Sequence, residues 1–196
     1  MNIHLVLITW NRLPYTKLSL DSILADKDEA FSLTIWDNGS TDGTVDYLKH
    51  EVSDPRIDEI VFSNRNVGQA QAINTIWTRS GADLLGKLDN DCIVTPGWTR
   101  TLAQAHAVIP QLGVVACWHL SPEDFDYQKA RHKIQTFGRH QILRHPTTCG
   151  TGLLIKRQIY RKMGKLPSGA TTPYWLKMAK AGCINGYYYP LIFQEH

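Results

Sequence analysis

Cysteine is scarce in this sequence, and its spacing argues against one common class of metal site. The four cysteines lie far apart and form no C-x-x-C pair: Cys92, Cys117, Cys149 and Cys183. Zinc sites built from thiolates usually need such close pairs, so we expect none here. We interpret the thiols as reduced and mostly buried, which is typical of a cytoplasmic protein.

Long hydrophobic runs are also missing. No stretch of about 18 apolar residues occurs, so the sequence predicts no transmembrane segment. The apolar stretch from Met1 to Ile8 is too short for the hydrophobic region of a secretory signal and leads directly to Asn11 and Arg12. It therefore predicts a first strand and not a targeting segment.

A large excess of one charge sign is absent as well. The chain has 21 lysines and arginines against 18 aspartates and glutamates, a formal net charge of +3. This mild basicity suits anionic small molecules and does not indicate a nucleic-acid partner. With 196 residues, 43% of them hydrophobic, the chain can bury a sizeable core, and we expect one domain over 1–196.

What the sequence does contain is an alternation of apolar strands and amphipathic helices. Apolar runs predict strands at 5–8, 33–36, 57–62, 82–88 and 113–118, with helices after the loops that separate them. One of these helices is expected to begin with Thr95 as N-cap and Pro96 at its first position. The alternation predicts an α/β/α sandwich with a mixed, mostly parallel sheet.

The second half of the chain is less regular. A hairpin is expected over 133–143 with Gly138 and Arg139 at its turn. A strand at 153–155, helices around 159–163 and 174–180, and a final strand at 187–193 complete the predicted elements.

Polar clusters follow three of the predicted strands, at residues 9–12, 37–44 and 89–91. In open α/β sheets ligands bind beyond the carboxyl ends of the strands, so we expect these clusters to converge on one site. Within the second cluster, Asp42 could simply cap the helix that follows it.

Asp89 and Asp91 form an acidic pair at the end of the fourth predicted strand. Two carboxylates one residue apart offer hard oxygen ligands that suit Mg²⁺ or Mn²⁺, ions that are often completed by substrate phosphates. A D-x-D triplet by itself is also compatible with an acidic loop that caps the next helix. The pair therefore indicates a metal-assisted reaction on a phosphate-bearing donor only in combination with the other clusters.

Taken in order, four blocks of the chain resemble family 2 glycosyltransferases of the GT-A fold. The blocks are Ile8-Thr9-Trp10-Asn11-Arg12, Asp37 to Thr44 (pattern D-[DN]-G-S-T-D-G-T), Asn66-Val67-Gly68 with Asn74, and Leu88-Asp89-Asn90-Asp91. Downstream, 150–164 resembles the acceptor-side segment of the family and 180–196 its closing helix and strand. The resemblance covers nearly the whole chain and implies a nucleotide-sugar-binding half at 1–118 and an acceptor-side half at 119–196.

The resemblance also implies roles for individual residues. Asp37 would accept a hydrogen bond from the uracil ring N–H of a UDP-sugar; the expected donor-binding set is Thr9, Asn11, Arg12, Asp37, Asn66, Gly68, Asp89 and Asn90. Asp91 and His196 would bind Mn²⁺ or Mg²⁺, and Asp89 would contact the ribose or a metal-bound water. The metal would stabilise the departing diphosphate, and the sugar would pass to a carbohydrate or other hydroxyl acceptor held near Trp118, His119, Gly150 and Thr151.

One part of the family pattern is missing. Inverting members carry an acidic pair before the closing helix that supplies a general base, whereas 169–174 contains no carboxylate. A threonine hydroxyl is a poor base near neutral pH. The base could instead come from Asp124, Glu123, Asp126 or Glu195, the enzyme could be retaining, or the chain could be inactive as a transferase.

Two other functions stay open on the sequence. The missing base is compatible with a non-catalytic module that binds nucleotides or carbohydrates. Residues 89–93 also resemble the D-x-D-x-[TV] loop of haloacid dehalogenase-like phosphohydrolases, although that loop normally follows the first strand and not the fourth.

Overall fold

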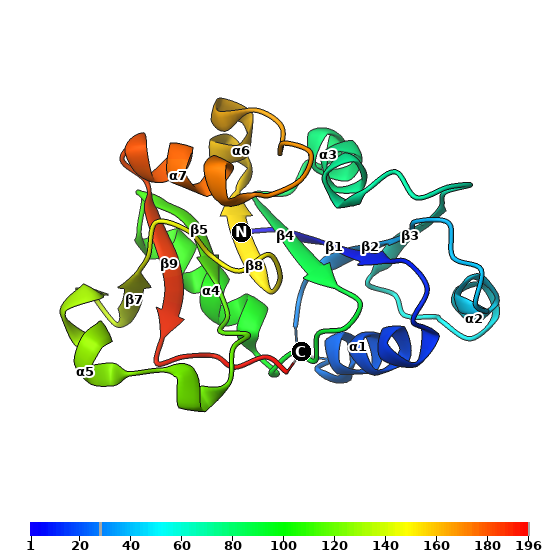
Figure 1. Cartoon of the computed structure of the whole chain (residues 1–196), viewed down its shortest axis with the longest axis horizontal. Coiled ribbons are helices and arrows are strands. Elements are labelled where there is room, and N and C mark those ends of the chain that lie inside the picture. Colours follow the sequence, from blue (N-terminus) through cyan, green and yellow to red (C-terminus); the bar gives the residue numbers. More distant parts are fainter. Residues whose placement is uncertain (28, 196) are drawn as a thin grey trace.

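The computed structural model describes residues 1–27 and 29–195, which form an α/β sandwich (Figure 1). The strands are β1 (Ile3–Thr9), β2 (Ser32–Asp37), β3 (Ile57–Phe62), β4 (Leu84–Asp89), β5 (Leu112–Ala116), β6 (Ile134–Phe137), β7 (His140–Arg144), β8 (Leu153–Lys156) and β9 (Ile184–Tyr189). The α-helices are α1 (Leu13–Ala25), α2 (Thr44–His50), α3 (Gln69–Arg79), α4 (Trp98–Val108), α5 (Tyr127–Ala130), α6 (Arg157–Met163) and α7 (Thr172–Lys180).

The strands of the described residues pair into one nine-stranded sheet in the order β3-β2-β1-β4-β8-β5-β9-β7-β6. Strands β8 and β7 run antiparallel to both of their neighbours, so the other seven strands share one direction. This confirms the mixed, mostly parallel sheet that the sequence predicts.

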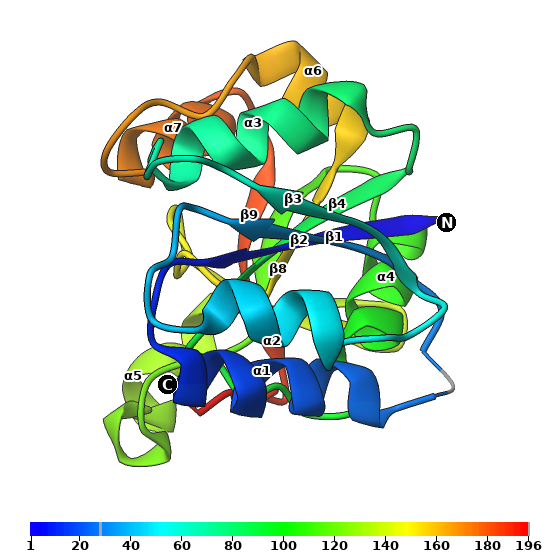
Figure 2. The same cartoon turned by 90° about the vertical axis from the view of Figure 1, so that its right-hand side faces the viewer.

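Helices cover both faces of the sheet (Figure 2). One apolar core lies between the sheet and α1, α2 and α4, and includes Leu20, Leu48 and Leu102. The other lies between the sheet and α3, α6 and α7. Strand β1 shows why its sequence is apolar without interruption: Leu5 and Leu7 enter the first core, while its alternate residues enter the second.

Helix α4 begins two residues later than predicted. Gly97, with φ 79°, precedes Trp98, the first helical residue. The Thr95 hydroxyl instead donates to the carbonyl of Phe193 at 2.6 Å. The Thr95 side chain is therefore used to hold the C-terminal segment, and the prediction of Thr95 as N-cap was wrong.

The last strand also differs from its prediction. It spans Ile184–Tyr189 and stops before Pro190, which has no N–H to donate to a ladder. Beyond it, Phe193 and Glu195 form isolated bridges with Trp118 and Ile93. The segment that follows the strand thus returns to the loops beyond β4 and β5.

The capping hypothesis for Asp42 is confirmed. Its carboxylate accepts the backbone N–H of Leu13 at 2.9 Å and both the N–H and the hydroxyl of Thr44. One side chain therefore satisfies donors at the start of two helices, α1 and α2, and these bonds lower the pKa of Asp42. None of the helices in the described chain is long and apolar enough to cross a bilayer.

Candidate active site

The loop between β1 and α1 adopts an uncommon backbone conformation. Asn11 and Arg12 have φ values of 55° and 59°, a region that non-glycine residues rarely occupy. Hydrogen bonds with the loop after β2 hold this conformation: the Asn11 N–H donates to Ser40 Oγ at 2.7 Å, and the backbone N–H of Thr41 donates to Asn11 Oδ1 at 2.8 Å. Two of the predicted polar clusters are thereby joined.

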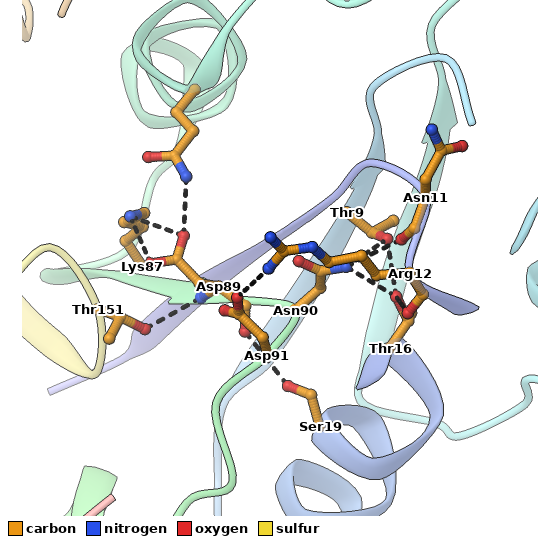
Figure 3. Close-up of polar contacts among 11 residues, drawn as sticks. Thr9, Asn11, Arg12, Thr16, Ser19, Lys87, Asp89, Asn90, Asp91 and Thr151 are labelled. Carbon is orange, nitrogen blue, oxygen red and sulfur yellow. Dashed lines mark hydrogen bonds and ion pairs between the residues drawn. The ribbon is translucent and has the colours of Figure 1, made fainter. Parts of the chain in front are cut away.

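Asn90 joins the third cluster to the first. Its amide nitrogen donates to Thr9 Oγ1, Thr16 Oγ1 and the carbonyl of Asn11, at 3.2, 2.9 and 3.1 Å (Figure 3). Asn90 is buried, so its amide acts as a brace between the loop after β4 and the loop after β1. This bracing directs the flanking carboxylates of Asp89 and Asp91 to the carboxyl edge of the sheet.

The two carboxylates of the acidic pair have different partners. Asp91 Oδ2 contacts Arg12 Nη1 at 2.7 Å, and the Arg12 side chain is 62% exposed while that of Asp91 is 15% exposed (Figure 3). Asp89 contacts the buried ammonium of Lys87 through both of its oxygens, at 2.8 and 3.0 Å. Gln69 donates a further bond to Asp89 Oδ1 at 3.0 Å.

These partners decide which carboxylate suits a metal ion. Asp89 accepts hydrogen bonds from the buried Lys87 and from Gln69 on α3. Asp91 instead pairs with Arg12, whose exposed side chain can be displaced. Among the described residues no group of three or more His, Cys, Asp or Glu side chains is arranged to hold a metal, and the predicted ligand His196 lies outside them. Mg²⁺ and Mn²⁺ are commonly held by one or two carboxylates plus substrate phosphates, so Asp91 fits such an ion when a diphosphate completes the shell.

A cavity of about 580 Å³ opens beside the acidic pair. Of the residues predicted to bind the donor, those that line it are Asn11, Arg12, Asn66, Gly68, Asp89 and Asn90, together with Asp91. Thr9 and Asp37 are fully buried and do not line it. Asp37 Oδ1 accepts the N–H groups of Gly39 and Ser40, while its buried Oδ2 has no hydrogen-bond partner among the described residues.

The residues predicted for the acceptor side are spread over several places. Trp118 and Asp124 line one cavity of about 430 Å³, and His119 and Glu195 line another of about 630 Å³. Thr151 lies at the acidic pair itself, because its hydroxyl accepts the backbone N–H of Asp89 at 3.0 Å (Figure 3).

The candidate bases differ in their relation to the acidic pair. Glu195 exchanges backbone bonds of 2.9 and 3.1 Å with Ile93, two residues after Asp91. Asp124 instead lies with Glu123 in a short 3₁₀ turn, and Asp126 accepts from Lys129 and caps α5. Only the backbone of Glu195, among these four, is directly paired with the loop that follows the acidic pair in the described residues.

The cysteines are free thiols, and three of them are buried. Cys92, Cys117 and Cys149 are buried and Cys183 is half-buried, and none forms a disulfide in the described chain. Burial raises the pKa of Cys92 to about 12 and that of Cys149 to about 11. Both thiols therefore stay protonated near neutral pH, which disfavours them as nucleophiles.

Sequence reasoning missed Lys87 and Gln69. Lys87 stands inside an apolar strand two residues before Asp89, so both side chains project from the same face of β4. A lysine in a strand buried on both faces was a usable signal that it has an anionic partner. Gln69 gave no such signal, because its contact depends on how α3 packs over the sheet.

The fold and the site define a class: a GT-A sandwich with an acidic pair at the carboxyl edge of its sheet. The family model for glycosyl transferase family 2 matches residues 5–164, and the chain belongs to this family. No curated protein sequence matches the chain significantly.

Solved structures of the same fold are similar to this chain over its whole length. Mannosyltransferase PcManGT from Pyrobaculum calidifontis, in complex with GDP-Man and Mn²⁺, has a TM-score of 0.79 at 20% identity and covers 99% of this chain and 56% of its own. S. aureus TarS 1-349 in complex with UDP-GlcNAc has a TM-score of 0.71 at 14% identity, with 100% and 58% covered. GalNAc-T7 with UDP, GalNAc and Mn²⁺ has a TM-score of 0.74 at 13% identity, with 100% and 44% covered. The chain thus spans about half of these proteins.

Proposed function

We propose that this protein transfers a sugar from a UDP-sugar to a hydroxyl group of a carbohydrate or other acceptor, with Mn²⁺ or Mg²⁺ as cofactor. One observation carries the proposal: Asp91 and Arg12 lie together at a cavity of about 580 Å³ beyond the carboxyl ends of the parallel strands. A carboxylate for a metal and a guanidinium for phosphate oxygens are the two groups that a nucleoside diphosphate needs there.

The similar structures support a nucleotide-sugar donor. Their complexes contain GDP-Man, UDP-GlcNAc or UDP with GalNAc, and two of the three contain Mn²⁺.

Individual roles follow from the geometry. Asp91 would hold the divalent ion, which when bound supplies Lewis-acid stabilisation of the departing diphosphate. The family resemblance implies His196, which lies outside the described residues, as its second ligand. Arg12 lies beside Asp91 and would contact phosphate oxygens, and Asp89 is held by Lys87 so that it can contact the ribose. Asp37 would accept the uracil ring N–H only after its buried Oδ2, which does not line the cavity, becomes accessible to the base.

For the general base, we propose Glu195 ahead of Asp124. The pairing of its backbone with Ile93 ties it to the loop that carries Asp91. A carboxylate from the C-terminal segment would replace the one that 169–174 lacks.

Calorimetric titration with UDP tests the proposal. We expect UDP to bind in the presence of Mn²⁺, to bind at least tenfold more weakly with EDTA, and to outcompete GDP. Asp91→Ala should lose the metal-dependent part, while the exposed control Asp46→Asn on α2 should keep it. UDP binding that is unchanged by EDTA and by Asp91→Ala would contradict the proposal.

A non-catalytic module is the second candidate, and the missing carboxylate at 169–174 favours it. Release of UDP across a panel of sugar donors and acceptors separates the two, because only an enzyme turns over. The family match gives no support to the phosphohydrolase alternative.

A further inference from the structure

The two halves of the chain carry opposite charge. Residues 1–126 contain 9 lysines and arginines against 17 aspartates and glutamates, whereas residues 127–194 contain 12 lysines and arginines and no acidic residue. The net charge of +3 therefore hides a strongly basic second half. A long segment without a carboxylate leaves its cations without local counter-charges, which favours contact with an anionic partner.

Helices α6 and α7 gather five of these cations on one surface. The two helices pack against each other on the face of the sheet that α3 also covers (Figure 1 and Figure 2). The exposed basic residues are Arg161 and Lys162 on α6, Lys165 just after it, and Lys177 and Lys180 on α7. We call these five the α6–α7 surface. The ion pairs of the described chain involve none of them.

Contacts between the two helices show that this surface is continuous. The ammonium of Lys177 donates to the carbonyl of Met163, the last residue of α6, at 2.7 Å. Burial raises the pKa of Cys183, and the charge of Lys162 opposes this rise, which places Lys162 near the chain just beyond α7. The cations of α6 therefore lie beside those of α7.

An apolar side chain lies among the cations. Leu176 is 37% exposed on the outer side of α7, one helical turn before Lys180. Basic residues around an exposed leucine are typical of a helix that lies on an anionic membrane, with the cations at the headgroups and the leucine at the boundary with the acyl chains. A nucleic acid or a free phosphate ion would engage the cations but not the leucine.

We propose that the α6–α7 surface docks this protein on an anionic lipid bilayer, with its five cations at the headgroups and Leu176 inserted between them. Such docking is peripheral and reversible, because salt screens the attraction of exposed charges to the bilayer. The inference goes beyond the proposed function, since the docking requires neither a nucleotide sugar nor the acidic pair.

Cosedimentation of the full chain with lipid vesicles, in the absence of nucleotide, tests the inference. We expect binding to vesicles of equal parts phosphatidylcholine and phosphatidylglycerol and none to vesicles of phosphatidylcholine alone. A rise in salt from about 0.1 M to about 0.5 M should release the protein from the anionic vesicles.

Substitutions separate the contributions of charge and of the leucine. Combined replacement of Arg161 and Lys165 by glutamine should weaken the binding to anionic vesicles about 25-fold, or about fivefold per cation at the surface. Leu176→Gln should weaken it about threefold, because part of one leucine is no longer buried in the bilayer. Combined replacement of Lys162 and Lys180 by glutamine repeats the charge test if the melting temperature shows that the first double variant does not fold.

Arg131→Gln together with Lys133→Gln is the matched control. It removes the same charge from exposed positions directly after α5, at the opposite end of the molecule from α6 and α7 (Figure 1). Because salt screens charges over such a separation, this variant should change vesicle binding by less than about twofold.

Several outcomes would overturn the inference. They are absence of binding to anionic vesicles, equal binding to neutral and anionic vesicles, equal losses in the control and in the α6–α7 variants, and unchanged binding by Leu176→Gln. Tighter binding to a DNA duplex than to the anionic vesicles at the same salt would assign the surface to a nucleic acid instead. None of these measurements involves UDP, so their failure is distinct from a failure of the proposed function.

Discussion

At the scale of single residues, the acidic pair is asymmetric. Asp89 and Asp91 are equivalent in the triplet D-N-D, yet Asp89 contacts the buried Lys87 and also Gln69, whereas Asp91 contacts the exposed Arg12. The exposed position of Arg12 makes its ion pair the weaker restraint, because solvent screens such contacts. We therefore propose Asp91, and not Asp89, as the carboxylate that exchanges its partner for a metal ion.

Arg12→Ala should strengthen the binding of Mn²⁺ in the absence of nucleotide. The guanidinium competes with the metal for Asp91, and an exposed ion pair of this kind corresponds to an effect of about two- to fivefold in affinity. Titration calorimetry of wild type, Arg12→Ala, Asp91→Ala and the double variant measures it. Weaker or unchanged Mn²⁺ affinity in Arg12→Ala would contradict the competition, and Asp91→Ala should erase the difference between the two backgrounds.

At the scale of elements, Asn74 couples α3 to the segment between α6 and α7. Its side chain exchanges bonds of 2.9 and 2.8 Å with the N–H and carbonyl of Leu166, and accepts from the Tyr160 hydroxyl at 3.0 Å. These contacts make Asn74 a packing amide between α3 and this segment. Leu166 also lines a cavity of about 210 Å³ between α3 and the start of α7, so the same bonds fix this part of the cavity wall.

Asn74→Ala should lower the free energy of unfolding by about 1–3 kcal/mol, because it leaves the backbone groups of Leu166 without partners. Urea denaturation measures the change. The neighbouring Thr75→Ala, on an exposed face of the same helix, should change stability by less than about 0.5 kcal/mol. A loss in Asn74→Ala no larger than that of Thr75→Ala would show that α3 is held by its apolar contacts alone.

At the scale of the whole molecule, one buried histidine links stability to pH. His106 on α4 is 1% exposed, and its Nε2 contacts the carbonyl of Leu154 on β8 at 3.1 Å. Burial, with a smaller contribution from Lys156, lowers the pKa of His106 to about 3 from its ordinary value of 6.5. Below pH 6.5 the unfolded chain binds a proton that the folded chain refuses, so stability falls as the pH drops from 6.5 towards 3.

We expect this one group to account for a loss of about 2 kcal/mol between pH 6.5 and 5, at about 1.4 kcal/mol per pH unit. His106→Gln retains an amide that can donate to Leu154 and does not titrate, so its free energy of unfolding should fall less over this range. Urea denaturation of both proteins at pH 7, 6 and 5 measures the difference. Parallel pH profiles for the two proteins would contradict the assignment to His106.

The sequence by itself determined the fold class and the edge of the sheet where the site lies. Apolar strands such as 5–8, and the helices between them, follow from local hydrophobic periodicity. This periodicity can be recognised in the sequence without knowledge of tertiary contacts. The position of residues 9–12, 37–44 and 89–91 follows from the rule that parallel strands end at the same edge. Helix boundaries that depend on distant residues could not be predicted. Thr95 was expected to cap a helix, but its hydroxyl donates to the carbonyl of Phe193, 98 residues away.

Only the tertiary structure decided which charged residues pair at the site and which side chains line its cavity. The contacts of Gln69 with Asp89 and of Arg12 with Asp91 join residues 20 and 79 positions apart, and no sequence spacing encodes them. Trp77 donates its indole N–H to the carbonyl of Gly86, whereas the indole N–H of Trp175 has no partner among the described residues. This difference depends on how α3 and α7 pack over the sheet. Hydrophobic periodicity predicts which residues are buried, whereas the hydrogen-bond and ion-pair partners of those residues depend on how the helices and strands pack together.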